Sequence, residues 1–135
     1  MGKKENKAYA MANKNFIMQL LKKDDVTQIT RGVFYKVLTK GSSDIKPIAS
    51  SVVSVHYEGR LIDGTIFDSS ADKDYAVAFR LRELIEGWKI ALLSMHIGDK
   101  WEIYLSHDMG YGAKKVDNIP GCSTLIFTVE LCAVN

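Results

Sequence analysis

The strongest local constraint on this chain is the segment 52–68, which reads VVSVHYEGRLIDGTIFD. Apolar and polar residues alternate along 52–58, which is the pattern of a strand with one buried face. The Asp63-Gly64 pair that follows favours a tight hairpin, because glycine accepts positive φ. The chain then returns through Phe67 and Asp68, so the hairpin is expected to place both residues close to Tyr57. Core packing would explain the two aromatic residues, but it does not require the carboxylate.

The rest of the chain predicts an α+β domain in which an antiparallel sheet wraps over one amphipathic helix. Further strands are predicted at 33–41, as short strands around a polar loop within 65–80, at 100–106 and at 123–134. Alternation points Trp101, Ile103 and Leu105 inward in one strand, and Leu125, Phe127, Val129 and Leu131 in another. The helix is predicted over 82–95, with Leu84, Trp88, Leu92 and Met95 toward one side, and Gly98 is expected to stop it.

A second amphipathic helix is predicted near the N-terminus, over residues 3–23. Its apolar stripe consists of Tyr9, Ala12, Phe16 and Leu20, with lysine and asparagine on the other side. We therefore expect a helical appendage at 1–30 and the main domain at 31–135. The stripe suits packing against the chain's own body and packing against a second copy equally well, so monomer and homodimer both stay open.

Composition excludes several classes of partner. The net charge of +2 at pH 7 gives no basic surface of the kind that binds nucleic acid. No window reaches the roughly 18 apolar residues of a membrane span. Residues 1–20 lack the apolar core of a leader peptide. Cys122 and Cys132, placed in one strand, would lie about 33 Å apart, too far for a disulfide.

Catalysis by a nucleophile, a metal or a bound nucleotide has little support. The chain holds no G-x-S-x-G motif, no paired metal-ligand spacing and no glycine-rich phosphate loop. His56 lies on the polar side of its strand, His96 is placed in the last turn of the helix, and His107 opens a loop. Asp68 has two open interpretations: it caps the turn at 68–70, or it accepts a hydrogen bond from the Tyr57 hydroxyl.

Four motifs follow one another along the chain: VHYEGRLIDGTIFDSS, LIEGW, GYGA and IPGCSTLIFTVEL. In this order and spacing they resemble the FKBP-type peptidyl-prolyl cis–trans isomerases, the macrolide-binding immunophilins, over about residues 33–132. The helical N-terminus resembles that of the bacterial cell-envelope members. The resemblance implies a five- or six-stranded antiparallel sheet curled round the helix, with a shallow apolar pocket between them.

The resemblance also implies which residues form that pocket and what they do. Tyr57, Phe67 and Phe127 are its expected walls, Trp88 its floor, Tyr111 its rim and Asp68 its carboxylate, with Val77, Leu84, Ile85 and Ile119 as further substrate contacts. The Tyr111 hydroxyl and the Ile85 N–H are expected to hold carbonyl groups beside the rotating bond. The expected activity is rotation of X-Pro bonds in peptides and folding protein clients, with no cofactor or metal and with macrolides as inhibitors.

Three positions, in two regions of the chain, depart from the family pattern. Val77 is the best match to a position where the family has an aromatic residue. The loop 114–121 reads KKVDNIPG, so Asn118 and Gly121 replace an apolar residue and a proline. The altered loop leaves a rival function open, a chaperone-like module that binds unfolded chains without turnover. The expected location is the bacterial cell envelope, with the cytoplasm as the alternative.

Overall fold

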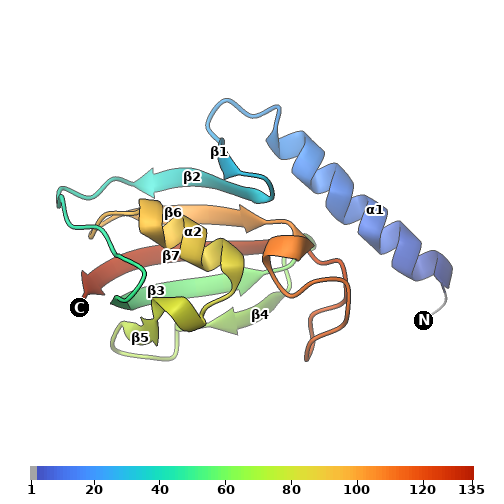
Figure 1. Ribbon diagram of the computed structural model, residues 1–135. Coiled ribbons are helices and arrows are strands. Elements are labelled where there is room, and N and C mark those ends of the chain that lie inside the picture. Colours follow the sequence, from blue (N-terminus) through green and yellow to red (C-terminus); the bar gives the residue numbers. More distant parts are fainter. Residues whose placement is uncertain (1–2) are drawn as a thin grey trace.

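The computed structural model describes residues 3–135 and shows one twisted antiparallel sheet with a helix on each face (Figure 1). The strands are β1 (Thr27–Thr30), β2 (Val33–Thr39), β3 (Val52–Arg60), β4 (Ile66–Ser69), β5 (Val77–Arg80), β6 (Lys100–Leu105) and β7 (Leu125–Val134). Their spatial order is β1-β2-β6-β7-β3-β4, and β5 also pairs with β3. The predicted α+β fold is confirmed. The seventh strand is β1, a short edge strand within the segment that was expected to be an appendage.

The hairpin predicted at Asp63-Gly64 joins β3 to β4. The Gly64 N–H donates to the Leu61 carbonyl over 3.0 Å, and Gly64 adopts a φ of +91°. The two strands pair Glu58 with Ser69 and Gly59 with Asp68, and a register shift follows at Arg60. The turn therefore fixes which residues of β3 and β4 lie opposite each other, and this pairing places Asp68 near Tyr57.

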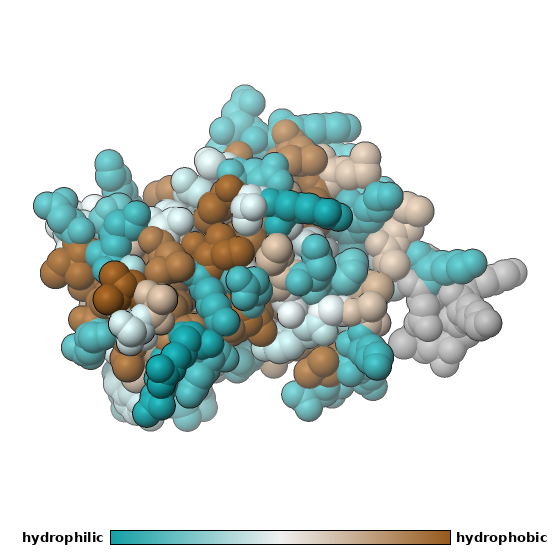
Figure 2. Space-filling view, viewed as in Figure 1, coloured by the Kyte–Doolittle hydropathy of each residue, from teal (hydrophilic) through white to brown (hydrophobic). Residues whose placement is uncertain are grey.

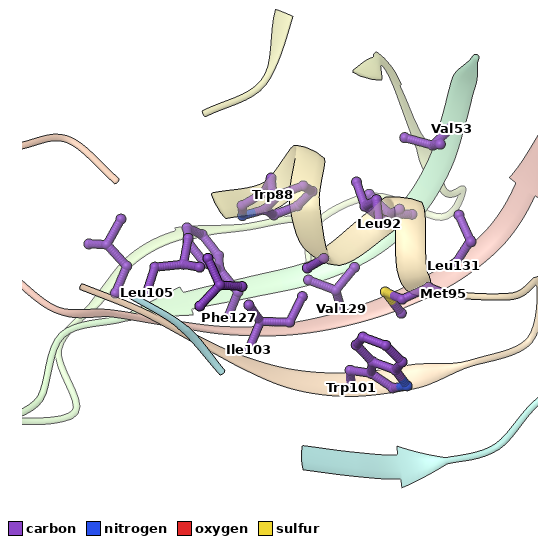
Figure 3. Packing of buried hydrophobic residues seen from close by; sticks show 14 of the residues in the cluster. Val53, Trp88, Leu92, Met95, Trp101, Ile103, Leu105, Phe127, Val129 and Leu131 are labelled. Atoms are coloured by element: carbon purple, nitrogen blue, oxygen red, sulfur yellow. The ribbon is translucent and has the colours of Figure 1, made fainter. Parts of the chain in front are cut away.

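The main core lies between the sheet and α2 (Glu86–Ser94), which crosses its concave face (Figure 3). The inward positions predicted for β6 and β7 are all buried. Hydrophobic side chains also gather over α2 and the strands around it in the space-filling view (Figure 2). The helix is shorter than predicted, because Leu81–Glu83 form a separate 3₁₀ turn and Ile85 is extended, with a ψ of 154°.

Gly98 does not terminate α2, and this prediction was wrong. The helix ends at Ser94, so His96 and Gly98 both lie in the connection to β6. The buried Asp99 carboxylate organises this connection by accepting hydrogen bonds from the His96 N–H over 2.8 Å and the Gly41 N–H over 2.7 Å. Asp99 thus ties the segment after β2 to the end of α2.

A second, smaller core lies on the opposite face of the sheet under α1 (Lys3–Leu20). It consists of Leu20, Phe34, Tyr104 and Ile126, with Phe16, Ile17, Val26 and Ile62 packed around them. The predicted stripe was wrong at one position: Ala12 is exposed, and Asn13 is buried in its place. A helix repeats every 3.6 residues, so the buried face drifts from Tyr9 through Asn13 to Phe16 and Ile17.

The prediction that the two cysteines share one strand was wrong. Cys132 lies in β7, whereas Cys122 lies in the preceding loop with a φ of +64°. Both thiols are free. Neither of the helices within residues 3–135 combines the length and the apolar character that a membrane crossing would need.

Candidate active site

The β3–β4 hairpin brings the Tyr57 hydroxyl to the Asp68 carboxylate. The hydroxyl donates to Asp68 Oδ2 over 3.1 Å, and the backbone N–H of Ser69 donates to Oδ1 over 2.9 Å. Of the two interpretations of Asp68, the structure shows the hydrogen bond from the Tyr57 hydroxyl. A turn cap would need the N–H of Ser70, which donates to the Tyr57 carbonyl instead. The exposed carboxylate therefore orients the phenol with one oxygen and accepts the neighbouring Ser69 N–H with the other.

Behind this pair lies a cluster of aromatic rings packed edge to face. The Trp88 indole meets Tyr57, Phe79 and Phe127, with ring centroids separated by 5.5, 6.0 and 5.1 Å. Phe67 meets Phe127 at 5.5 Å and an interplanar angle of 81°. Edge-to-face contacts place positive ring edges against negative ring faces, so they favour one arrangement of the rings. The cluster is thus a shaped apolar wall.

Gly59 makes room for this wall. A Cβ atom at this position would lie 2.7 Å from the Phe67 ring and 2.8 Å from the Phe127 ring. Any larger residue in the middle of β3 would push the two rings apart. Glycine is otherwise unfavourable inside a strand, so its presence here marks the close approach of the rings.

A concave space of about 220 Å³ opens beside Phe67. Its lining residues are Phe67, Asp68, Tyr111, Val116, Asp117, Asn118 and Ile119. Four of the predicted site residues therefore share one cavity: Phe67, Asp68, Tyr111 and Ile119. The volume is below the range of about 300–1,000 Å³ of sites for drug-sized ligands, so it suits one small group of a larger partner.

The other predicted residues lie behind or beside this cavity. Trp88 is only 4% exposed and belongs to the main core, so Phe127 and Phe67 separate it from the cavity. Leu84 and Ile85 are partly buried at the start of α2. Within residues 3–135, the Ile85 N–H donates to no protein acceptor, which leaves it available to a ligand.

The electrostatics of the site keep both of its phenols protonated. Burial, together with the charge of Asp68 and its hydrogen bond, raises the pKa of Tyr57 to about 12. Burial and the charges of Asp68 and Asp117 also raise the pKa of Tyr111. Both hydroxyl groups therefore remain hydrogen-bond donors throughout the physiological range. In the described part of the chain, no group of three histidine, cysteine or acidic side chains could hold a metal ion.

A larger cavity, of about 900 Å³, lies near the other end of α2 between Tyr35, Trp101, His96 and the segment after β2. Its lining contains none of the ten predicted site residues, all of which the structure describes. The smaller cavity is therefore the candidate active site, because four of the ten predicted site residues, Phe67, Asp68, Tyr111 and Ile119, line it.

Comparison with known proteins decides the family. Residues 43–132 match the family described as FKBP-type peptidyl-prolyl cis-trans isomerase. The chain belongs to this family. The FKBP-type 22 kDa isomerase of Escherichia coli is 36% identical over 128 residues, which are 94% of this chain and 62% of that protein. The outer membrane protein MIP of Legionella longbeachae is 36% identical over 131 residues, or 96% of this chain and 54% of that protein.

A solved structure shows the same FKBP-type fold over nearly the whole chain. The crystal structure of a peptidyl-prolyl cis-trans isomerase from Pseudomonas syringae superposes with a TM-score of 0.88 at 36% identity, covering 96% of each chain. The chain spans about three fifths or less of the length of the two named relatives from Escherichia coli and Legionella longbeachae. The resemblance seen in the four sequence motifs is therefore confirmed at the level of family and fold.

Sequence reasoning missed Phe79, one of the three rings that contact Trp88. Phe79 pairs with Val53 on β3, and Val77 pairs with Val55, so both β5 residues point toward the same face of the sheet. It is the Phe79 ring that packs on Tyr57 and Trp88, whereas Val77 lies two residues earlier along that face. Alternation along β5 could have identified Phe79, but the polar residues before it left the register of this short strand open.

Gly121, one of the three departures from the FKBP-type pattern, has a steric reason. A Cβ atom at residue 121 would lie 2.1 Å from the Ala113 carbonyl oxygen. The two limbs of the loop between β6 and β7 approach too closely there for any side chain, proline included. The loop has thus its own backbone path, closed by two hydrogen bonds between Val116 and Ile119.

Proposed function

We propose that this chain accelerates cis–trans rotation of X-Pro peptide bonds in peptides and in folding proteins. The observation that carries the proposal is the cavity between Phe67, Tyr111 and Ile119, with Asp68 at its edge and the Trp88 ring cluster behind it. Support also comes from the family, whose description and named relatives are isomerases of this type.

The proposed chemistry needs no covalent step. Rotation about the peptide bond breaks amide resonance, which gives a barrier of about 18–20 kcal/mol. The twisted amide has lost charge separation and is less polar than either planar form, so apolar walls such as Phe67 and Ile119 stabilise it more than the planar forms. Only such preferential binding of the transition state lowers the barrier, and each 1.4 kcal/mol or so gives about tenfold in rate.

The polar groups are proposed to hold the substrate while the bond rotates. The Tyr111 hydroxyl and the free Ile85 N–H donate hydrogen bonds to the carbonyls that flank the prolyl bond. Asp68 keeps the Tyr57 hydroxyl oriented and contributes a negative field beside the amide carbonyl. Asp68 thus acts through electrostatics, and no step of this proposal transfers a proton.

Exchange NMR on a short X-Pro peptide tests the proposal. The cis and trans signals of the peptide should exchange measurably faster when the chain is added at substoichiometric concentration. The uncatalysed rotation takes tens to hundreds of seconds, so even modest catalysis is visible. Unchanged exchange with a folded protein would defeat the isomerase proposal and favour the rival, a chaperone-like module that binds without turnover.

The rival has one observation in its favour. Two exposed polar residues of the altered loop, Asp117 and Asn118, line the cavity together with the apolar groups. They would weaken a strictly apolar transition-state site without preventing peptide binding. Macrolides are proposed as ligands of the same cavity, and competition between a macrolide and the peptide in the same NMR titration tests this.

We also propose that the chain forms a homodimer through α1, within the helical appendage assigned to residues 1–30. Met11 and Met18 on α1 and Leu21 just after it are 55%, 51% and 60% exposed, and Met18 and Leu21 line an open groove between the helix and Phe34 of β2. Sedimentation of the full chain tests this. Met18→Glu should convert a dimer to a monomer, and a monomeric unmodified chain would contradict the proposal.

The proposed location is the cell envelope. Its support is limited to the relative from Legionella longbeachae, which is named an outer membrane protein. Fractionation of the source cells, followed by immunodetection of this protein, tests the proposal.

A further inference from the structure

We propose that α1 positions the rim of the active site, so that Tyr9 and Asn13 tune substrate binding without touching substrate. This inference rests on the proposed function of the cavity. The loop between β6 and β7, residues 106–124, carries Tyr111 and Ile119, two residues that line the cavity. Near its end, Ser123 and Thr124 contact residues of α1 that lie more than 100 positions away in the sequence. Figure 1 shows α1 and this loop at the same end of the sheet.

The first connection is a chain of two hydroxyl groups. The Ser123 hydroxyl donates to the Pro120 carbonyl over 2.6 Å, and the Tyr9 hydroxyl lies 2.7 Å from the same Ser123 oxygen. Ser123 has one hydroxyl proton, which it uses toward Pro120, so Tyr9 must be the donor to Ser123. The chain ends at Pro120, whose neighbour Ile119 is a wall of the cavity.

The second connection is the buried side chain of Asn13. Its Oδ1 accepts a hydrogen bond from the Thr124 N–H over 2.7 Å, and its Nδ2 donates to the Tyr9 carbonyl over 2.8 Å. Asn13 is 3% exposed and Thr124 is 2% exposed. Separation of α1 from the loop would leave these buried polar groups without partners, which is costly. The helix therefore holds residue 124 rigidly.

The side of the loop that contacts α1 is hydrogen-bonded to the opposite side of the loop. The Cys122 N–H donates to the Gly112 carbonyl over 3.0 Å, one residue after Tyr111. Val116 and Ile119 exchange two backbone hydrogen bonds of 3.0 and 2.8 Å nearer the tip. Because the two sides of the loop are joined by these backbone hydrogen bonds, a shift of residues 120–124 displaces both Tyr111 and Ile119.

A purely structural role for α1 makes a different prediction. The C-terminal part of the helix already covers the sheet through Leu20 and Phe16, so packing alone would stabilise the whole domain evenly. Tyr9 and Asn13 instead lie nearer the N-terminus of the helix than Phe16 and Leu20, and their hydrogen bonds reach only the loop and the helix itself. A local effect on the loop is therefore the distinguishing observation.

Hydrogen exchange and steady-state kinetics on the full chain test the inference together. Tyr9→Phe removes one hydroxyl group, and Asn13→Ala removes the bond to Thr124. Each should accelerate exchange of the Val116, Ile119 and Cys122 amides about fivefold, as expected for one lost hydrogen bond. Each should raise KM for an X-Pro peptide by a similar factor with little change in kcat, because ground-state and transition-state contacts are weakened alike.

The matched controls are Asn15→Ala and Tyr75→Phe. Asn15 is an exposed asparagine on the same helix, and Tyr75 is an exposed tyrosine. Both should leave the amide exchange of the loop and KM unchanged. If Asn13→Ala fails to fold, Tyr9→Phe still decides, because it keeps the ring and removes only the hydroxyl oxygen.

A double-mutant cycle adds a readout that structural weakening would not produce. In the Ser123→Ala background the Tyr9→Phe change should have no further effect on loop exchange or KM, because the hydroxyl chain is already broken. Additive effects of Tyr9→Phe and Ser123→Ala would contradict the proposal that the two hydroxyl groups act as one chain. Unchanged loop exchange in both Tyr9→Phe and Asn13→Ala would overturn the inference as a whole. An unmodified chain without isomerase activity would instead overturn the proposed function, since the exchange data do not depend on turnover.

Discussion

The Trp88 indole and the Phe127 ring pack edge to face, with centroids 5.1 Å apart and an interplanar angle of 86°. Because Trp88 is 4% exposed, it supports the cavity through Phe127 and is at the same time a member of the main core. Figure 3 shows the indole on α2 directed at the strands that carry Phe127 and Leu105. A large truncation of Trp88 therefore cannot separate its contribution to stability from its contribution to activity.

Replacement of Trp88 should accordingly cost stability before it reports on the site. Trp88→Ala should lower the free energy of unfolding by about 3–5 kcal/mol, as truncations of buried aromatic residues do. Trp88→Phe should lower it less and still reduce kcat/KM, because a smaller ring no longer supports Phe127. Denaturant unfolding and the peptide assay check the two effects. An Ala variant as stable as the parent would contradict the placement of Trp88 in the core.

Phe67 is the cleaner probe of the cavity, because it lines the cavity and is only partly buried. Phe67→Ala should reduce kcat/KM at least tenfold, since about 1.4 kcal/mol of lost transition-state binding gives that factor. The matched control is Ile66→Ala, the adjacent exposed residue on the other face of β4. Equal activity of the two variants, both folded by circular dichroism, would refute the role given to Phe67.

The Tyr57–Asp68 hydrogen bond predicts non-additive effects. Tyr57→Phe and Asp68→Ala each remove the same bond, so each should reduce kcat/KM several-fold and the double variant should lose little more. Asp68→Asn keeps an acceptor oxygen and should fall between the parent and Asp68→Ala. The pairwise coupling is obtained from the four kcat/KM values. Strict additivity would mean that the carboxylate acts independently of the phenol.

The raised tyrosine pKa values predict a flat pH profile. Activity should be constant from pH 6 to 8, because the Tyr57 phenol, with a pKa of about 12, and the Tyr111 phenol, whose pKa is also raised, stay protonated. A limb near pH 6.5 in kcat/KM would instead point to a histidine.

The raised pKa of Tyr57 should make stability depend on pH in the alkaline range. A folded-state pKa above the unfolded value of about 10 stabilises the protein fully below pH 10. That contribution is lost as the pH rises from 10 to 12 through the folded pKa of Tyr57. Unfolding in denaturant at a series of pH values checks the sign. Stability that increases above pH 10 would contradict the protonated Tyr57–Asp68 pair.

Local patterns in the sequence determined most of the fold. Alternation over 52–58 and the Asp63-Gly64 turn specify the hairpin that unites Tyr57 and Asp68, because strand period and turn geometry depend on neighbouring residues alone. The inward faces of β6 and β7 followed from the same rule. The family followed from the order and spacing of four motifs.

Only the tertiary structure decided the features that depend on distant contacts. Asn13 is buried because Thr124 donates to it, and Phe79 joins the ring cluster because β5 pairs with β3 in one register. The pairing of β1 with β2 and the left-handed backbone at Cys122 likewise require partners elsewhere in the chain. A period in the sequence states which residues of one segment share a face. The packing of all segments together decides which residues that face contacts. The hydrogen bonds from α1 to the loop at the rim of the cavity could therefore be seen only in three dimensions.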